Sequence, residues 1–381
     1  MSDRLDPRAS GRFYTRIFLG LVIAFFIFLI VISFFPPHFS STRAPQPPIT
    51  FFPPSQQQET VPAKDQVFYS NASGLFSYDV MTGKTWQIAA VNASTSVFNG
   101  RRIASDTIAF EVGQAYSSQT SSIYMLDLAS DTLTRETDVG GDAGWYIDNL
   151  IFIAPGEFVY TEASATASML DNDDRVFLFK NGTTTQFGYI ANPGEYGSTL
   201  SSAPDGKHLF FAGQIYSMAT GSWTPITGKC KGSESAWLNN DVVVLKWESD
   251  YNAGNICYYD ITSGMTEDVG GVTEGFNVMG NNIFYMYPAA TPSGLFEISQ
   301  YDYATHAARI VIPNARFWSY YAYDMNDLPG VVYQPVISSG TCMDLDCFGG
   351  IASGNLMLFD PVTGSIAPLG FGSAENITDL F

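Results

Sequence analysis

Histidine is scarce in this chain of 381 residues, which contains only His38, His208 and His306. None of the three has an evident serine or cysteine partner, so we expect no catalytic triad, and we predict that His208 and His306 are solvated turn residues. The motifs G-x-S-x-G, H-E-x-x-H, C-x-x-C and the P-loop are absent from the sequence as well. These absences predict a protein that is not an enzyme and that uses no cofactor or metal.

Positive charge is scarce too, with 18 Lys and Arg residues against 37 Asp and Glu residues, and the net charge is −19. A surface of this sign repels phosphate groups, so we predict that the protein does not bind nucleic acid. We interpret the negative charge as a means of keeping an exposed domain soluble, and a cation-binding surface is the alternative.

Long hydrophobic runs are limited to one, residues 17–35, which are 19 residues without a charge. As a helix this run spans about 28 Å, enough to cross the hydrocarbon core of a bilayer. It lacks the small-residue cleavage pattern of a signal peptide, and four arginines precede it. We therefore predict a signal anchor with a cytoplasmic tail, residues 1–16, and the rest of the chain outside the cell or in a lumen. A cleaved signal peptide is the alternative.

Proline is concentrated directly after this run. Residues 36–64 hold eight prolines in 29 residues. Such a composition favours an extended stalk over a folded domain. The predicted ectodomain is therefore residues 65–381.

A repeated hairpin organises residues 65–381. Its first copy, Gly74–Trp86, has two apolar strands around a turn that opens with Asp79 and ends with Gly83. The aspartate can accept hydrogen bonds from amides that follow it, and glycine tolerates positive φ, so the chain can reverse here. The turn-opening residues of the seven copies are Asp79, Asp127, Lys180, Ser217, Asp260, Asp302 and Asp360. They are 37 to 58 residues apart, which is typical of four-stranded propeller blades.

One turn in the fourth copy carries a resemblance to known proteins. The stretch Ser202–Phe211, SAPDGKHLFF, resembles the turn of TolB-type propellers, and the Asp-opened hairpin resembles WD40-like and YVTN-like repeats. The resemblance covers residues 65–381 as an architecture and indicates no specific family. It implies an all-β, seven-bladed β-propeller, with six or eight blades as alternatives. A β-sandwich or β-solenoid would also bury such strands, but a sandwich does not need seven evenly spaced copies.

The first blade lacks a strand in the sequence. Residues 66–70 read as the second strand of a blade, with no strand before them. An open ring would leave two bare sheet edges, so we predict that part of residues 373–381 supplies the missing strand. A frayed tail is the alternative.

The four cysteines all follow the predicted membrane span. In an oxidising compartment they can form two disulfides, and we favour Cys230–Cys257 and Cys342–Cys347 among three pairings. Buried free thiols are the alternative. Four sequons on the same predicted side indicate a glycoprotein; they are Asn71, Asn92, Asn181 and Asn376.

The longest interval between hairpins, from Asp302 to Asp360, is the predicted binding surface, since extra loop length on a rigid scaffold often serves recognition. Its aromatic side chains can stack on sugar or peptide, and a disulfide would brace its acidic part. The candidate binding residues are Trp318, Tyr320, Tyr321, Tyr323, Asp344 and Asp346. We interpret the acidic run Asp171–Asp174 as a solvated loop rather than a Ca²⁺ site.

Together these features predict a single-pass membrane protein whose propeller binds a protein or glycan partner without catalysis. One alternative is a glycan-active hydrolase or lyase with carboxylates near the ring axis, and another is a structural subunit of a membrane complex. The order of tail, span and propeller also resembles the front half of membrane dipeptidyl peptidases. Those proteins continue into an α/β-hydrolase domain that this sequence does not contain, so we expect no peptidase activity.

Overall fold

The computed structural model divides the chain into two compact units, residues 1–46 and 47–381. The residues that it describes all lie in the second unit: 49–52, 66–92, 95–113, 120–140, 142, 144–164, 173–191, 199–227, 230, 232, 234–250, 253–273, 275–288, 296–317, 323–324, 328, 330–338, 351–352, 355–373 and 379–380. Within these ranges there is no helix long and apolar enough to cross a membrane. The predicted span at residues 17–35 lies outside them.

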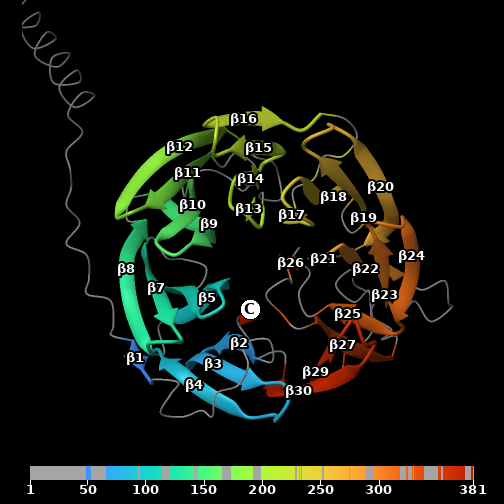
Figure 1. Cartoon of the computed structure of the whole chain (residues 1–381), viewed down its shortest axis with the longest axis horizontal. Helices are drawn as coiled ribbons and strands as arrows, with labels where there is room; N and C mark the ends of the chain where they lie inside the picture. The colour runs from blue at the N-terminus through green and yellow to red at the C-terminus, as the bar shows by residue number, and fades with distance from the viewer. Residues whose placement is uncertain are drawn as a thin grey trace, which may run out of the picture. The chain divides into compact units, whose positions relative to one another are not determined.

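Seven predominantly antiparallel sheets are arranged in a ring, as blades of a β-propeller (Figure 1). This confirms the predicted all-β, seven-bladed fold. From the inner to the outer edge, blade 1 contains β31 (Asp379–Leu380), β2 (Gln66–Asn71), β3 (Gly74–Asp79), β4 (Thr85–Ala90) and β1 (Thr50–Phe51). Blade 2 contains β5 (Ser96–Ala104), β6 (Thr107–Gly113), β7 (Thr120–Asp127) and β8 (Thr132–Gly140). Blade 3 contains β9 (Trp145–Ala154), β10 (Glu157–Ser164), β11 (Asp173–Lys180) and β12 (Thr183–Ala191).

The other four blades follow the same order around the ring. Blade 4 contains β13 (Ser201–Ser202), β14 (His208–Phe211), β15 (Gln214–Ser217) and β16 (Ser222–Pro225). Blade 5 contains β17 (Glu234–Trp237), β18 (Val242–Asp250), β19 (Ala253–Asp260) and β20 (Thr266–Thr273). Blade 6 contains β26 (Tyr323–Asp324), β21 (Phe276–Met279), β22 (Asn282–Pro288), β23 (Phe296–Asp302) and β24 (Ala307–Ile312). Blade 7 contains β25 (Ala315–Phe317), β27 (Val331–Ser338), β29 (Asn355–Phe359) and β30 (Ile366–Ser373), with β28 (Ile351–Ala352) paired to β27.

Blade 1 is completed by strands from both ends of the unit. The C-terminal strand β31 pairs with β2, Leu380 opposite Tyr69, so the predicted closure of the ring is confirmed. At the outer edge β1 pairs with β4, Phe51 opposite Ala89. Strand β1 was not anticipated, since Thr50 and Phe51 fall in the predicted stalk; the other stalk residues lie almost entirely outside the described ranges.

The core of the propeller lies between the blades. Apolar side chains form clusters that join neighbouring sheets, such as blades 1 and 2 around Phe110 and blades 2 and 3 around Phe158. The second strand of each blade is buried on both faces, which explains its nearly continuous apolar sequence. The disulfide Cys230–Cys257, with Cα atoms 5.7 Å apart, adds a covalent link within this core and confirms that predicted pair. Cys342 and Cys347 lie outside the described residues.

The hairpin turns form as their sequence predicts. Asp79 Oδ1 accepts hydrogen bonds from the amides of Met81 (2.8 Å) and Thr82 (3.2 Å), and Gly83 has φ of 69°. The same pair of amide hydrogen bonds recurs at Asp127, Asp260, Asp302 and Asp360. The carboxylate thus replaces backbone partners that a tight turn cannot supply.

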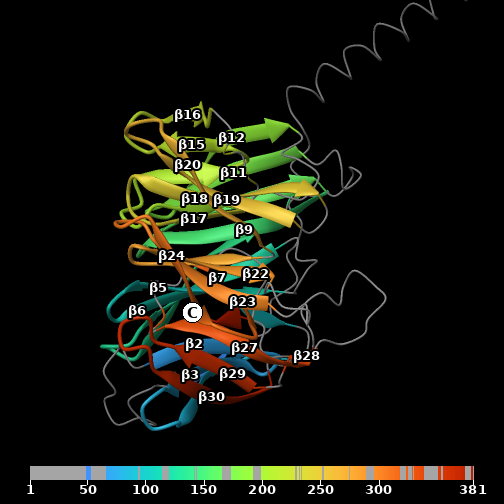
Figure 2. The same cartoon turned by 90° about the vertical axis from the view of Figure 1, so that its right-hand side faces the viewer.

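The two faces of the ring differ in the connections that they carry (Figure 2). The turns between the third and fourth strands of the blades are two to six residues long and lie on one side, the short-turn face. The second strands of the blades end, and the third strands begin, on the other side, which we call the long-connection face because six to sixteen residues separate these strands in the sequence of blades 2, 3, 6 and 7.

Candidate functional site

A β-bulge in β9, the innermost strand of blade 3, sets up the candidate site. Ile147 pairs with Glu162 and Leu150 with Tyr160, so Asp148 and Asn149 together oppose Thr161. The Asn149 amide donates to Thr161 Oγ1 over 3.1 Å, which fixes the extra residue. Bulges of this kind redirect side chains and are frequent beside functional sites.

Asp148 and Asp174 share one face of blade 3. Asp174 on β11 and Tyr146 on β9 are both in register with Ala163 of β10, so their side chains lie on the same face of the sheet. Asp148 follows Tyr146 by two residues and therefore returns to that face. The face is turned toward blade 4, because the Leu200 amide donates to Asn149 Oδ1 over 3.4 Å. We refer to Asp148 and Asp174 as the carboxyl pair.

Asp174 is the unusual member of the pair. Its residue is only 2% exposed, and no side chain or amide among the described residues donates a hydrogen bond to its carboxyl group. Burial raises the pKa of Asp174 to about 7, and the negative charges of Asp148 and Asp173 contribute. A buried carboxyl group to which none of the described residues donates is destabilising when ionised, which makes Asp174 a candidate for a functional role.

Asp148 differs from Asp174 in its surroundings. Burial is also the largest influence on its pKa, which is raised, although Asn149 Nδ2 donates to Asp148 Oδ2 over 2.7 Å and acts in the opposite direction. The residue is nevertheless solvent-exposed. Both observations fit a carboxyl group that water can reach but that protein surrounds on most sides. The pair thus combines a buried and an exposed carboxyl group, both with raised pKa values.

The opposite face of blade 3 holds a cation that does not reach the pair. Arg175 forms ion pairs with Glu162 and with Asp142, the latter over 2.9 Å, and its guanidinium lies 3.9 Å from the ring centre of Trp145. Burial raises the pKa of Glu162 in spite of Arg175. Arg175 therefore belongs to a separate, internally paired cluster.

Hydrogen bonds between inner strands hold blade 3 to its neighbours. Arg101 of β5 donates through Nη1 to the Phe152 carbonyl oxygen and to Ser202 Oγ, both over 3.2 Å. Ser201 Oγ lies 2.6 Å from Ser235 Oγ, which continues the polar contacts from blade 4 to blade 5. These bonds fix the strand that carries Asp148.

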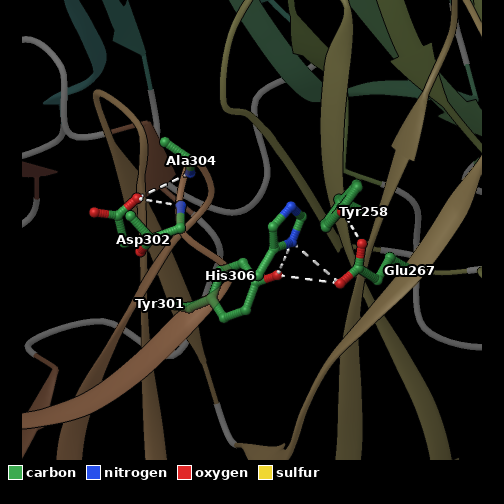
Figure 3. A network of polar contacts seen from close by, with 7 residues as sticks. Tyr258, Glu267, Tyr301, Asp302, Ala304 and His306 are labelled. Atoms are coloured by element: carbon green, nitrogen blue, oxygen red, sulfur yellow. Dashed lines mark hydrogen bonds and ion pairs between the residues drawn. The ribbon is translucent and has the colours of Figure 1, made fainter.

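A second polar network joins blades 5 and 6 near the short-turn face (Figure 3). Tyr258 donates a hydrogen bond to Glu267 Oε2, and Tyr301 Oη lies 3.3 Å from Glu267 Oε1. His306 Nδ1 lies 2.9 Å from Tyr301 Oη and 3.2 Å from Glu267 Oε1. His306 is an exposed turn residue, as predicted, and it also contacts Tyr301 and Glu267, which the sequence did not indicate. His208, the other described histidine, begins β14 and stacks on Trp237, so it is not simply solvated.

The residues predicted to bind a ligand are only partly placed. Tyr323 lies in β26, which pairs in parallel with β21 at the innermost edge of blade 6. The other five, Trp318, Tyr320, Tyr321, Asp344 and Asp346, lie outside the described residues. Of the predicted glycosylation sites, Asn71, Asn92 and Asn181 are in described turns or strand ends, and Asn376 is not described.

Sequence reasoning missed the carboxyl pair. The run Asp171–Asp174 was interpreted as a solvated loop, but Asp173 and Asp174 begin β11 and Asp174 is buried. No local pattern distinguishes Asp148, whose position depends on the bulge opposite Thr161. Among the described residues, no group of three or more Asp, Glu, His or Cys side chains is arranged to hold a metal ion.

Comparisons with known proteins place this geometry in context. No protein-family model matches the chain, and no curated protein matches its sequence. Solved structures match its fold. Prolyl oligopeptidase B from Galerina marginata is 11% identical with a TM-score of 0.54, over 85% of this chain and 50% of that one. A prolyl endopeptidase is 12% identical with a TM-score of 0.52, over 81% of this chain and 48% of that one. An oligogalacturonate lyase in complex with manganese is 12% identical with a TM-score of 0.50, over 86% of this chain and 96% of that one.

These similarities show the propeller architecture, consistent with the resemblance to TolB-like and YVTN-like propellers. The chain spans about half the length of the prolyl peptidases that it matches. The prediction that the protein is not an enzyme is corrected, because the solved structures that share its fold include a prolyl endopeptidase, a prolyl oligopeptidase and an oligogalacturonate lyase. At these identities the fold alone is shared, so any activity must be argued from the carboxyl pair.

Proposed function

We propose that this protein hydrolyses glycosidic linkages at the carboxyl pair of blade 3. The observation that supports this is Asp174, a buried carboxyl group with a pKa raised to about 7 beside the accessible Asp148. Two carboxyl groups in contrasting environments are the usual equipment for cleaving a glycosidic bond, because one must donate a proton while the other stays ionised.

The two members have different roles in this proposal. Asp174 is protonated over much of the range below pH 7 and acts as the general acid that protonates the leaving oxygen. Asp148 is held by Asn149, whose hydrogen bond favours the ionised form, and acts as the carboxylate that activates water or stabilises positive charge at the sugar. The β9 bulge and the bond to Leu200 keep this carboxylate oriented.

The setting of the propeller is proposed from the sequence. Residues 17–35 would anchor the chain with its N-terminus in the cytoplasm, and the propeller would face the cell exterior or a lumen of the secretory pathway. There it would meet glycans rather than nucleic acid, in keeping with the net charge of −19. Alkaline carbonate extraction of membranes tests the anchor, since an anchored chain stays in the pellet and a clipped chain is released.

The activity is tested on a panel of oligosaccharides with the full-length protein in detergent. We expect turnover that falls as pH rises through about 7, because Asp174 loses its proton there. Asp174→Asn and Asp148→Asn should each lower kcat/KM by about 100-fold or more. Reducing-end release, followed by chromatography, measures both values.

Asp205→Asn is the matched control. Asp205 lies in the turn between β13 and β14 on the short-turn face, where it accepts a hydrogen bond from the Lys207 amide. Asparagine can accept the same bond, so turnover should not change. Full activity in the Asp174→Asn variant, or no turnover of any glycan by the wild-type protein, would overturn the proposal.

A further inference from the structure

His306 occupies a position where most of the equivalent turns carry glycine, although the turn of blade 2 carries Asp131 with φ of 53°. It ends the turn that Asp302 opens, as Gly83, Gly264 and Gly364 end theirs. Its φ of 55° lies in the left-handed region, which only glycine adopts without steric cost. A histidine at this position carries a small backbone cost and can make contacts that glycine could not make.

Those contacts reach across the seam between two blades. The imidazole comes from blade 6, and its Nδ1 lies 3.2 Å from Oε1 of Glu267 on β20 of blade 5 (Figure 3). Tyr301 of β23 completes a triangle, with its hydroxyl 2.9 Å from Nδ1 and 3.3 Å from the same carboxylate oxygen. His306 and Glu267 are partly open to solvent, with side chains 53% and 42% exposed. Protons can therefore exchange freely at this triangle.

The other ionisable groups near the imidazole do not replace Glu267. From blade 5, Tyr258 donates to the second oxygen of Glu267 and packs against Tyr303, whose ring centre is 6.1 Å from that of His306. The Asp302 carboxylate is used by the amides of Ala304 and Thr305, and Asp260 by those of its own turn. Glu267 is thus the carboxylate that His306 contacts.

The hydrogen bonds of the triangle depend on the proton at Nδ1. When Nδ1 is unprotonated, it can only accept from Tyr301, and its lone pair faces the Glu267 oxygen without a proton between them. When both ring nitrogens are protonated, Nδ1–H donates to Glu267, and the Tyr301 hydroxyl is free to donate to the same carboxylate. Glu267 then accepts from three donors, and the contact across the seam becomes an ion pair.

We propose that His306 is a proton-dependent latch between blades 5 and 6, closed on Glu267 as an ion pair when its imidazole is protonated and weakened to at most a neutral-donor hydrogen bond when the imidazole is neutral. The latch acts through the seam and is independent of the carboxyl pair in blade 3. It strengthens when the imidazole takes up a proton and stays closed until Glu267 is itself protonated, and the hydrogen bond from Tyr258 and the charge of His306 lower the pKa of Glu267. A propeller in an acidifying lumen would be stiffened at this seam.

Hydrogen exchange of the full-length protein tests the latch. Amide protection in β20 and β23, corrected for intrinsic rates, is compared at pH 7.5 and pH 5.5. The wild-type protein should gain about two- to fivefold in protection at the lower pH, the range expected for a partly exposed ion pair. His306→Gln and Glu267→Gln should abolish the gain.

Two further variants separate the latch from backbone strain. His306→Gly removes the steric cost of the left-handed backbone conformation and also removes the imidazole. Amide protection should therefore change by the same factor at both pH values. Asn314→Gly relieves a left-handed residue at φ of 52° elsewhere and should leave the wild-type gain intact. An equal gain in wild type and His306→Gln, or a gain that persists in Glu267→Gln, would overturn the proposal.

Discussion

The two faces of the propeller use aspartate in opposite ways. On the short-turn face, Asp360 accepts hydrogen bonds from the Thr363 hydroxyl and from the Val362 and Thr363 amides, and these bonds lower its pKa. Toward the long-connection face, Asp174 has no such donor among the described residues, and burial raises its pKa to about 7. The first arrangement stabilises a turn, whereas the second keeps a proton available. A pKa that burial has shifted is a better indicator of a functional carboxyl group than the number of carboxylates in a region.

The largest expected effect on stability follows from Asp174. Its folded pKa of about 7 lies above the value near 3.9 of an unfolded aspartate, so the folded state binds more protons between these values. Stability should therefore fall as pH rises from about 4 to about 7, and Asp174→Asn should remove this fall. Allowing for solvent around the group, we expect the variant to be more stable at pH 8 by on the order of 2 kcal/mol. Thermal unfolding of the full-length protein between pH 4 and pH 8 measures the difference.

Asp174→Asn would distinguish the two uses of aspartate, because it should abolish the proposed activity and raise the stability of the folded protein. Equal stability of wild type and Asp174→Asn at pH 8 would show that the buried carboxyl group costs nothing. In that case Asp174 would not differ from an ordinary solvated aspartate.

At Asp360 we expect a smaller effect on stability, and a loss where Asp174→Asn gives a gain. Asp360→Ala removes the acceptor for its turn and should cost about 1 kcal/mol at pH 7 without changing turnover. Because the folded pKa of Asp360 is lowered, its contribution is present above the unfolded value and is lost as pH falls through the folded value. The difference in unfolding free energy between wild type and variant should therefore be larger at pH 7 than at pH 3.

Asp360→Asn is the control for that variant, since asparagine keeps the acceptor oxygen and loses only the charge. It should unfold much closer to wild type than Asp360→Ala does. If alanine and asparagine cost the same, the charge and not the hydrogen bonds would hold the turn.

The sequence predicted those parts of the fold that are set by local chemistry. The Asp-opened turn around Asp79 depends on residues within four positions of each other, and its spacing indicated the blade count. The closure by Leu380 followed from a missing strand, and the Cys230–Cys257 disulfide followed from cysteine number and compartment. Each of these features could be predicted without knowing which side chains of neighbouring blades are in contact.

The features that sequence reasoning missed all depend on contacts between distant segments. Strand β1 forms because Thr50 and Phe51 meet the free edge of β4, about 40 residues further along the chain. Asp174 lies on the face of blade 3 that is turned toward blade 4. His306 of blade 6 contacts Glu267 of blade 5. Pattern and propensity do not report which side chains of different blades come together.

The ionisation of Asp174 itself is the most direct test of the account. Selective ¹³C labelling of aspartate carboxyl groups, with Asp174→Asn to assign the signal, gives its titration curve by NMR. We expect a titration midpoint near 7 that moves to lower pH when Asp148 is changed to asparagine. A titration midpoint near 4 that is the same in wild type and in Asp148→Asn would contradict the assignment of Asp174 as a buried acid.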